Sequence, residues 1–292
     1  MFAPARALLS VRPHATPALL VAAASVALHF ATTPFLIPAI ADSYAVSLGA
    51  AGLISVSQVG GFTITNLFAG RRLVPRRRLL VGAAVAGVIS NAASALAVSY
   101  ALLLGLRTIA GIAAGLVTWL AWTEAMRNVR ALKDVSGVGP LTALLASPAV
   151  AWLIAVADER AVFVAIAVSC LPAAFMRTTF DAAPVPARRK MSPSQSNVVL
   201  LIALGIMTAA GSSLFVFAGS IGAERVDLDP LVVSLAFSAN AAAGLVATRR
   251  PRSTTRPWAW LGVIGGCAAL VAFGTLALPF FVAMALWGYA FW

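Results

Sequence analysis

The amino-acid sequence predicts an all-α protein that crosses a lipid bilayer many times, and three observations support this prediction. The 292-residue chain is 61% hydrophobic and only 10% charged, which leaves too little polar surface to cover a soluble globule of this size. Apolar stretches of about 18 residues or more recur along the whole sequence. These stretches lack the alternating pattern of barrel strands, so helices are the structures that satisfy their backbone hydrogen bonds in lipid.

Ten apolar spans are expected to form helices, and the last is too short to finish crossing. They cover residues 17–41, 48–70, 79–98, 100–126, 135–157, 161–180, 197–221, 230–248, 258–277 and 279–292. The first span is similar to a secretory signal, but it is too long and contains Pro34 and Pro38, so we expect it to be retained. The last would give about 21 Å of helix against a hydrocarbon core of about 30 Å.

The charged residues of the loops predict how the chain is threaded. Of the 21 Lys and Arg residues, 18 fall in the N-terminal tail and in every second loop. The other loops carry the acidic residues Asp42, Asp158, Glu159, Glu224, Asp227 and Asp229. Because cytoplasmic loops are enriched in Lys and Arg, we expect a multi-pass protein of the cell (inner or plasma) membrane with a cytoplasmic N-terminus. The net charge of +12 therefore reports topology and does not indicate a nucleic-acid partner.

A polar, proline-containing segment divides the chain into two predicted bundles. We expect a cytoplasmic tail at 1–16, a six-helix N-terminal bundle at 17–180, a cytoplasmic linker at 181–196 and a partial C-terminal bundle of helices 7–10 at 197–292. A short repeat relates the two bundles, because N-L-F-A-G-R-R at 66–72 and G-L-V-A-T-R-R at 244–250 each close an even-numbered helix. Two repeated halves are typical of carriers that bind their substrate between the halves.

The most specific motif lies in the fourth span, where Arg107–Gly115 reads R-T-I-A-G-I-A-A-G. Its spacing of four puts Arg107, Gly111 and Gly115 on one stripe of a helix, so a groove for close helix packing lies beside a cation. Together with the arginine-rich loop after the second span, this pattern resembles the major facilitator superfamily over essentially the whole chain. The resemblance implies that family's fold, with about nine full transmembrane helices and part of a tenth, and secondary transport by alternating access.

Arg107 has two interpretations. A charge inside a membrane span is costly unless it is paired or wetted, which favours a place in a polar cavity. The resemblance then implies a role in proton coupling or substrate contact. Alternatively, the long side chain reaches the lipid headgroups near Ser99 and Tyr100.

The arginine-rich loops depart from the family's pattern. Arg71 and Arg72, with Arg249 and Arg250 in the repeat, lack the acidic residue that the family places before them to latch its two halves. These arginines therefore either take part in gating or anchor the topology at the headgroups.

The fifth span carries part of a motif found in antiporters of the family. Gly139 and Pro140 match its start, but the second glycine pair is missing. Either a gating kink or plain helix packing accounts for them. The resemblance therefore leans toward the drug and sugar efflux (drug:proton antiporter) branch.

Polar residues inside other spans complete the candidate substrate and proton pathway. The resemblance implies a cavity lined by the first and seventh helices, which carry His29, Thr32, Thr33, Thr208, Ser212 and Ser213. A histidine side chain changes charge near physiological pH, although a single histidine in a helix can equally be a hydrogen-bonded packing residue. Bonds between helices are expected from Gln58, Asn66, Asn91 and Asn240. An ion pair is expected between Glu124 and Arg127.

The leading hypothesis is a secondary active transporter of a small organic solute, working by proton-coupled efflux. The expected partners are the solute, protons and the bilayer, without nucleic acid, and a monomer is expected. No cofactor or metal is expected, because Cys170 and Cys267 form no ligand pattern. Catalytic motifs such as H-E-x-x-H and G-x-S-x-G are missing, which disfavours a membrane-embedded enzyme. A non-transporting, truncated fragment is the alternative, because a complete second half would need about two and a half more helices.

Overall fold

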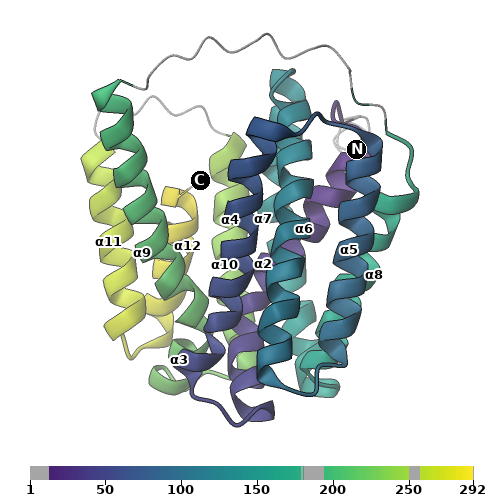
Figure 1. The fold of residues 1–292 in the computed structure, drawn as a ribbon. Helices are drawn as coiled ribbons and strands as arrows, with labels where there is room; N and C mark the ends of the chain where they lie inside the picture. The colour runs from purple at the N-terminus through teal and green to yellow at the C-terminus, as the bar shows by residue number, and fades with distance from the viewer. Residues whose placement is uncertain (1–12, 179, 181–193, 250–256, 292) are drawn as a thin grey trace, which may run out of the picture. The chain divides into compact units, whose positions relative to one another are not determined.

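The chain is described here by a computed structural model that covers residues 13–178, 180, 194–249 and 257–291, and every regular element in these ranges is an α-helix (Figure 1). The helices are α2 (Pro17–Ser43), α3 (Leu48–Ala51), α4 (Leu53–Arg72), α5 (Arg77–Ala95), α6 (Tyr100–Ala125), α7 (Val129–Val156), α8 (Glu159–Phe175), α9 (Gln195–Arg225), α10 (Pro230–Arg249), α11 (Pro257–Phe273) and α12 (Ala277–Phe291). The predicted all-α fold class is confirmed.

The helices follow the predicted spans closely, and the differences have local causes. The span at 48–70 is divided between α3 and α4, where Gly52 closes α3. Helix α7 begins at Val129, ahead of the predicted 135, because its first turns are charged and therefore lie outside the apolar run. Asn128 Oδ1 accepts a hydrogen bond from the Arg130 backbone nitrogen at 2.9 Å, which stabilises this early start.

Length and hydropathy mark six candidate membrane spans among the described residues. They are α2, the stretch Leu48–Arg72 that joins α3 and α4, α5, α6, α7 and α10. Helices α11 and α12 are also apolar, although they have only 17 and 15 residues. The chain is therefore a multi-pass membrane protein, as its hydropathy predicts.

Contacts within the chain define two compact units, each described here by itself. Unit 1 comprises Met1–Phe30, Val56–Ala143 and Arg160–Phe180, and unit 2 comprises Ala31–Ser55, Leu144–Glu159 and Asp181–Trp292. These bounds pass through α2, α4, α7 and α8 and so differ from a division at the linker. The two bundles expected at 17–180 and 197–292 stay a prediction.

The core of unit 1 is built mainly from small side chains, which let helix backbones approach closely. Its buried members come from α2, α5, α6 and α8, and they are Leu19, Ala22, Val26, Leu80, Ala83, Ala84, Ala114, Val117, Leu120, Ala121 and Ala173. Phe30 and Phe62 pack beside this core edge to face, with ring centroids 5.3 Å apart. The core therefore joins four helices with little side-chain volume between them.

Helices α4 and α6 are in backbone contact through their glycines. A Cβ atom added at Gly111 would collide with the backbone of Gln58, and one added at Gly115 would lie 2.6 Å from the Phe62 backbone oxygen. Conversely, a Cβ added at Gly61 of α4 would collide with the Thr108 backbone oxygen of α6. The predicted groove at Gly111 and Gly115 therefore receives α4.

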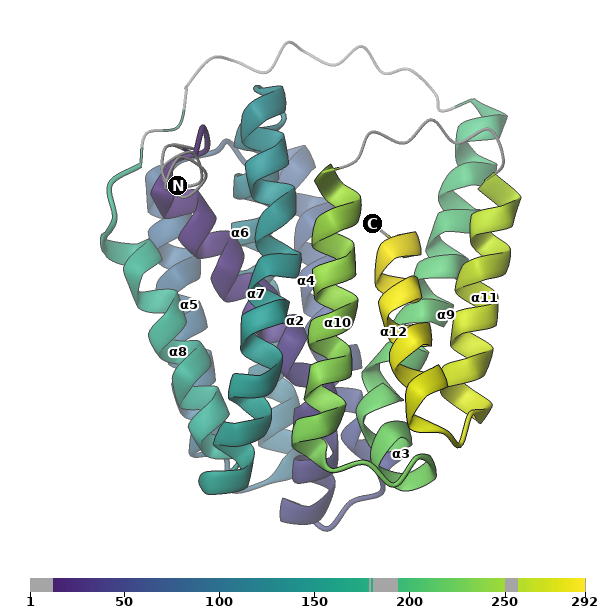
Figure 2. The same cartoon turned by 180° about the vertical axis from the view of Figure 1, so that it is seen from behind.

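Unit 2 packs through aromatic rings and one half-buried amide. Helix α12 packs against α10 and α11 (Figure 2). The Phe215 ring meets Phe237 and Trp287 edge to face, at centroid distances of 5.0 and 5.9 Å. Asn240 Nδ2 donates to the Met284 backbone oxygen at 2.8 Å, so α10 and α12 are joined across helices as expected.

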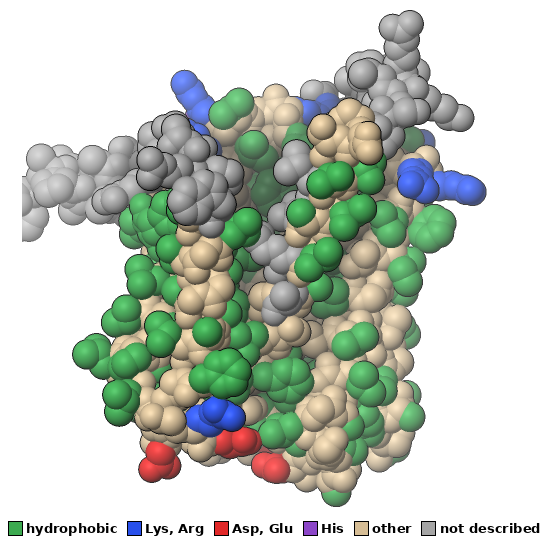
Figure 3. Space-filling model, turned by 90° about the vertical axis from the view of Figure 1, so that its left-hand side faces the viewer, with side chains coloured by type: hydrophobic (Ala, Val, Ile, Leu, Met, Phe, Trp, Pro, Cys, Tyr) green, Lys and Arg blue, Asp and Glu red, His purple; other side chains and the backbone are tan. Residues whose placement is uncertain are grey.

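The outer face that carries α9 and α11 is strongly apolar (Figure 3). Its exposed hydrophobic side chains include Val198, Val199, Ile202 and Ile206 on α9 and Leu261, Leu270 and Phe273 on α11. Acidic side chains gather at the lower edge of this face, together with a basic side chain (Figure 3). Such a face is unsuited to water and well suited to the hydrocarbon of a bilayer.

We predict that Gly111→Ala destabilises the protein, because the added methyl has only the backbone of Gln58 to displace. Overpacking of this kind costs about 1–3 kcal/mol, and thermal unfolding of the purified protein in detergent measures it. Gly105→Ala is the matched control, since Gly105 lies on the same helix and an added Cβ meets nothing within 4 Å. Equal unfolding temperatures for the two variants would contradict the close packing of α4 and α6.

Candidate functional site

The most polar part of the interior of unit 1 is a cluster of four side chains, named here the Arg107 cluster. Its members are His29 of α2, Asn91 and Ser94 of α5, and Arg107 of α6, and none is more than 3% exposed. Residues 78 positions apart in the sequence thus meet inside an apolar unit. Because these groups are buried, their hydrogen bonds to one another decide their energy.

Arg107 is held by neutral groups. Its Nη2 donates hydrogen bonds to Asn91 Oδ1 at 2.9 Å and to Ser94 Oγ at 2.7 Å. Its Cζ lies 4.6 Å from the ring centroid of Phe163 on α8, a cation–π contact. Its Nε has no hydrogen-bond partner among the described residues.

The strength of these contacts explains how an arginine is tolerated here. An arginine at the centre of a membrane helix costs about 2.5–3.5 kcal/mol on the insertion scale. A hydrogen bond from a charged donor contributes about 1.5–3 kcal/mol, so two of them offset a cost of this size. The guanidinium faces inward at 1% exposure, which does not fit a side chain that reaches toward headgroups.

Asn91 joins Arg107 to His29. Its Nδ2 lies 2.9 Å from His29 Nε2 and donates to the Gly87 backbone oxygen at 2.7 Å. His29 Nδ1 lies 3.0 Å from the Ser25 backbone oxygen of its own helix. Gln58 Nε2 donates to the His29 backbone oxygen at 3.5 Å, so α4 also contacts α2 at this level.

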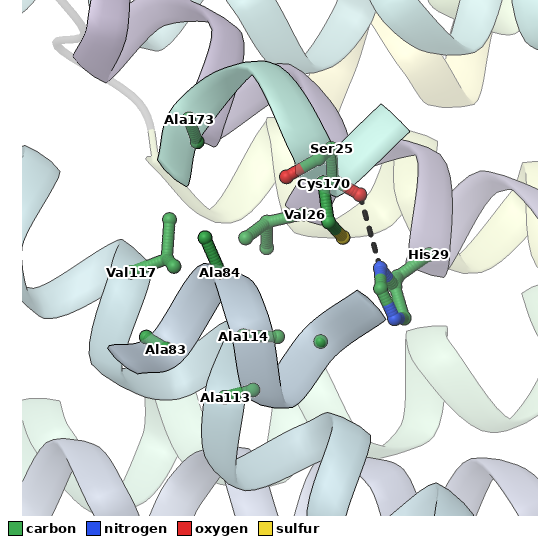
Figure 4. A pocket seen from close by; sticks show the side chains of 11 residues that line it. Ser25, Val26, His29, Ala83, Ala84, Ala113, Ala114, Val117, Cys170 and Ala173 are labelled. Carbon is green, nitrogen blue, oxygen red and sulfur yellow. Dashed lines mark hydrogen bonds between the residues drawn. The ribbon is translucent and has the colours of Figure 1, made fainter. Parts of the chain in front are cut away.

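A small cavity lies beside the histidine (Figure 4). Ser25, His29 and Cys170 supply its polar wall, and alanines of α5 and α6 line the opposite side (Figure 4). The space open to the centre of a water-sized molecule is about 10 Å³, which is about one water. In this conformation the cavity is too small for an organic solute.

The structure places the other predicted pathway residues differently. Thr32 and Thr33 are buried on α2, whereas Ser212 and Ser213 are exposed on α9. The side chain of Thr208 lies outside the described residues. These residues stay predictions. Arg107 and His29 are the predicted pathway residues that the structure brings together, through Asn91.

Apart from Gly111 and Gly115 of α6, the predicted packing and gating residues are found on three helices. Gly139 and the buried Pro140 lie inside α7. Arg71 and Arg72 are exposed in the last turn of α4. Arg249 ends α10, but its side chain and the whole of Arg250 lie outside the described residues. A gating role for any of them stays a prediction.

Several predicted polar contacts can be compared with the structure. Gln58, Asn91 and Asn240 bond across helices as expected. For Asn66 the expectation is wrong, because its Nδ2 donates to Phe62 of its own helix at 2.9 Å. The expected ion pair is confirmed, with Arg127 Nε 3.6 Å from Glu124 Oε2.

Ser94 is the member of the cluster that the sequence analysis did not identify. Its position three residues after Asn91 is a usable signal, because residues at i and i+3 share a helix face. A polar pair on one face of an otherwise apolar helix indicates a buried polar partner.

Comparison with known proteins gives a consistent family. The family model described as Major Facilitator Superfamily matches residues 18–292. A protein of Streptomyces lividans named "Chloramphenicol resistance protein" is 28% identical over 265 residues, which cover 83% of this chain and 67% of that protein.

Solved transporters share the fold at low sequence identity. A bacterial homologue of the human lysosomal transporter Spinster matches with a TM-score of 0.66 at 14% identity, over 94% of this chain and 70% of its own. A D-xylose-proton symporter matches with a TM-score of 0.65 at 17% identity, over 94% of this chain and 79% of its own. The nucleoside transporter NupG, solved as a D323A mutant, matches with a TM-score of 0.61 at 13% identity, over 94% of this chain and 79% of its own.

We predict that Ser94→Ala lowers stability more than Ser90→Ala does. Both serines are 1% exposed on α5, but Ser90 Oγ donates only to Gly87 of its own helix among the bonds described, whereas Ser94 Oγ accepts from Arg107. Losing a hydrogen bond to a charged group costs about 1.5–3 kcal/mol. Thermal unfolding in detergent compares the two, and an equal loss would show that Ser94 does not support the guanidinium.

Proposed function

Since the chain belongs to the major facilitator superfamily, we propose that it exports a small organic solute from the cell in exchange for protons, by alternating access. Its family and the solved transporters of the same fold support the more general description as a secondary transporter. Alternating access moves a central site between the two sides of the membrane without breaking a covalent bond of the solute.

The name of the Streptomyces relative supports the direction of transport. That protein is named for chloramphenicol resistance, and a membrane carrier can protect a cell from a small organic drug by moving it outward. The solved structures are less than 25% identical to this chain, so they support the fold and leave the choice of solute to experiment.

The observation that carries the proton coupling is the Arg107 cluster. Ionisable side chains inside membrane helices are expensive, and they mark substrate or proton pathways in transporters. Here an arginine and a histidine are joined through one amide at distances of 2.9 Å on either side. A change in charge at one of them is therefore transmitted to the other.

The loop charges support a cytoplasmic N-terminus in the cell membrane, and we predict the location of two reporter fusions. A fusion after Arg72 should fluoresce with a green fluorescent protein reporter, because the basic loop stays inside. A fusion after Asp158 should instead activate a periplasmic phosphatase reporter. The same location for both fusions would contradict the proposed threading.

Reconstituted vesicles test the function directly. We predict that vesicles with an acidic lumen accumulate radiolabelled chloramphenicol, or another member of a panel of small organic drugs, and that a protonophore abolishes the accumulation. Arg107→Ala should lower it at least about tenfold, a loss equal to one hydrogen bond from a charged donor.

Thr108→Ala is the matched control, because Thr108 Oγ1 bonds only to Leu104 of its own helix among the bonds described. Equal accumulation in the presence and absence of the pH gradient would exclude proton coupling. A fully active Arg107→Ala protein would remove the arginine from the pathway. Failure to move any member of the panel would favour a non-transporting product.

A further inference from the structure

We propose that Nε2 of His29 is the proton-binding site of this transporter, and that the Asn91 amide makes protonation of His29 incompatible with the hydrogen bond from Arg107 to Asn91. The link to transport rests on the proposed function. The protonation of His29 itself can be measured without any solute.

Two neighbours fix the orientation of the Asn91 amide. A guanidinium can only donate, so the atom of Asn91 that lies 2.9 Å from Arg107 Nη2 is the oxygen, Oδ1. A backbone carbonyl can only accept, so the atom 2.7 Å from the Gly87 oxygen is the nitrogen, Nδ2. The two requirements are independent, and they agree.

This orientation determines the protonation of His29. The second N–H of Asn91 Nδ2 points to His29 Nε2 at 2.9 Å, so Nε2 accepts and carries no proton. The Ser25 backbone oxygen, 3.0 Å from Nδ1, can only accept, so Nδ1 carries the proton. The conformation described therefore holds a neutral histidine in a single tautomer.

A second proton on the ring conflicts with the cluster. A proton on Nε2 would face an N–H of Asn91, so two donors would meet. Rotating the amide by half a turn presents Oδ1 to the new N–H, but it then turns Nδ2 toward Arg107 and Oδ1 toward the Gly87 oxygen. Either way a buried bond is lost, and a lost bond to a buried charged group is costly.

The charges around His29 also disfavour a second proton on its ring. Arg107 of α6 is the charged group placed beside the histidine, and like charges repel strongly where water is excluded. The Cys170 thiol of α8 lines the same cavity. The facing groups from α4 and α5 are the uncharged Gln58 and Asn91. A proton that enters from the water-sized cavity therefore binds only as Arg107 leaves Asn91.

Proton coupling requires that binding of a proton changes the conformation, and the incompatibility of a protonated His29 with the Arg107–Asn91 hydrogen bond supplies such a change. The neutral histidine holds Asn91 and Arg107 in the arrangement described, and the protonated histidine favours an arrangement in which Arg107 has given up that bond. A ligand shifts a conformational equilibrium only when it binds the two states differently. Here the proton is that ligand, and it adds one positive charge to the cluster per binding event.

Nuclear magnetic resonance of labelled histidine tests the starting state. The chain has two histidines, so His14→Gln leaves His29 as the only one. In the full-length variant with ¹⁵N-labelled histidine in lipid, we expect a protonated Nδ1 and an unprotonated Nε2 at neutral pH. A proton on Nε2 at neutral pH would overturn the proposal.

Asn91→Asp tests the exclusion itself. A carboxylate accepts from both the Nε2 proton and Arg107, so it removes the meeting of two donors at His29, at the cost of the hydrogen bond to the Gly87 oxygen. The doubly protonated ring should then persist to a pH about one unit higher, a tenfold change within the usual range of coupling. Asn66→Asp is the control, because Asn66 makes the same bond to the residue four positions earlier but lies outside the cluster. An unchanged titration in Asn91→Asp would refute the mechanism.

Arg107→Gln provides a second route if Asn91→Asp does not fold. Removing the neighbouring cation should also let the doubly protonated ring persist to higher pH, and no shift would again refute the mechanism. In vesicles, His29→Gln should lower gradient-driven accumulation at least tenfold and flatten its pH dependence, whereas His14→Gln should retain both. A normal pH dependence in His29→Gln would overturn the role of His29. If the resonance measurements give the expected results but no solute is transported, the proposed transport function is wrong and the proposed proton-binding site at His29 is retained.

Discussion

The burial of one guanidinium group among apolar helices is the constraint on which the rest of unit 1 depends. Arg107 is 1% exposed, so its guanidinium depends on partners from neighbouring helices. Polar side chains of α5 and an aromatic ring of α8 supply them. The alanines and glycines of these helices make the contacts possible, because small residues let the helix backbones approach closely.

The partners described for Arg107 are neutral, and this shapes the chemistry of the cluster. A carboxylate would cancel its charge and hold it with a strong ion pair. Amide and hydroxyl groups leave the charge in place and bind it with fixed donor and acceptor directions. The cluster therefore responds to the arrival of another charge, such as a proton, more readily than a closed ion pair would.

The sequence predicted the helices well, because hydrophobicity alone determines which segments can enter lipid. It also identified Arg107, Gly111 and Gly115, since their spacing places them on one helix stripe. It could not pair Arg107 with Asn91 or Ser94, because the choice of neighbouring helix depends on the packing of the whole unit. Asn66 shows the same limit: an amide in an apolar helix needs a partner, but its own backbone can supply it.

The backbone contact between α4 and α6 has a mechanical consequence. Helices separated by side chains can slide as rotamers change, but contacts at Gly61, Gly111 and Gly115 leave no soft layer to deform. Helices α4 and α6 must then move as one rigid body during any rearrangement. Gln58 of α4 also contacts the backbone at His29, so a displacement of this rigid pair moves α2 as well.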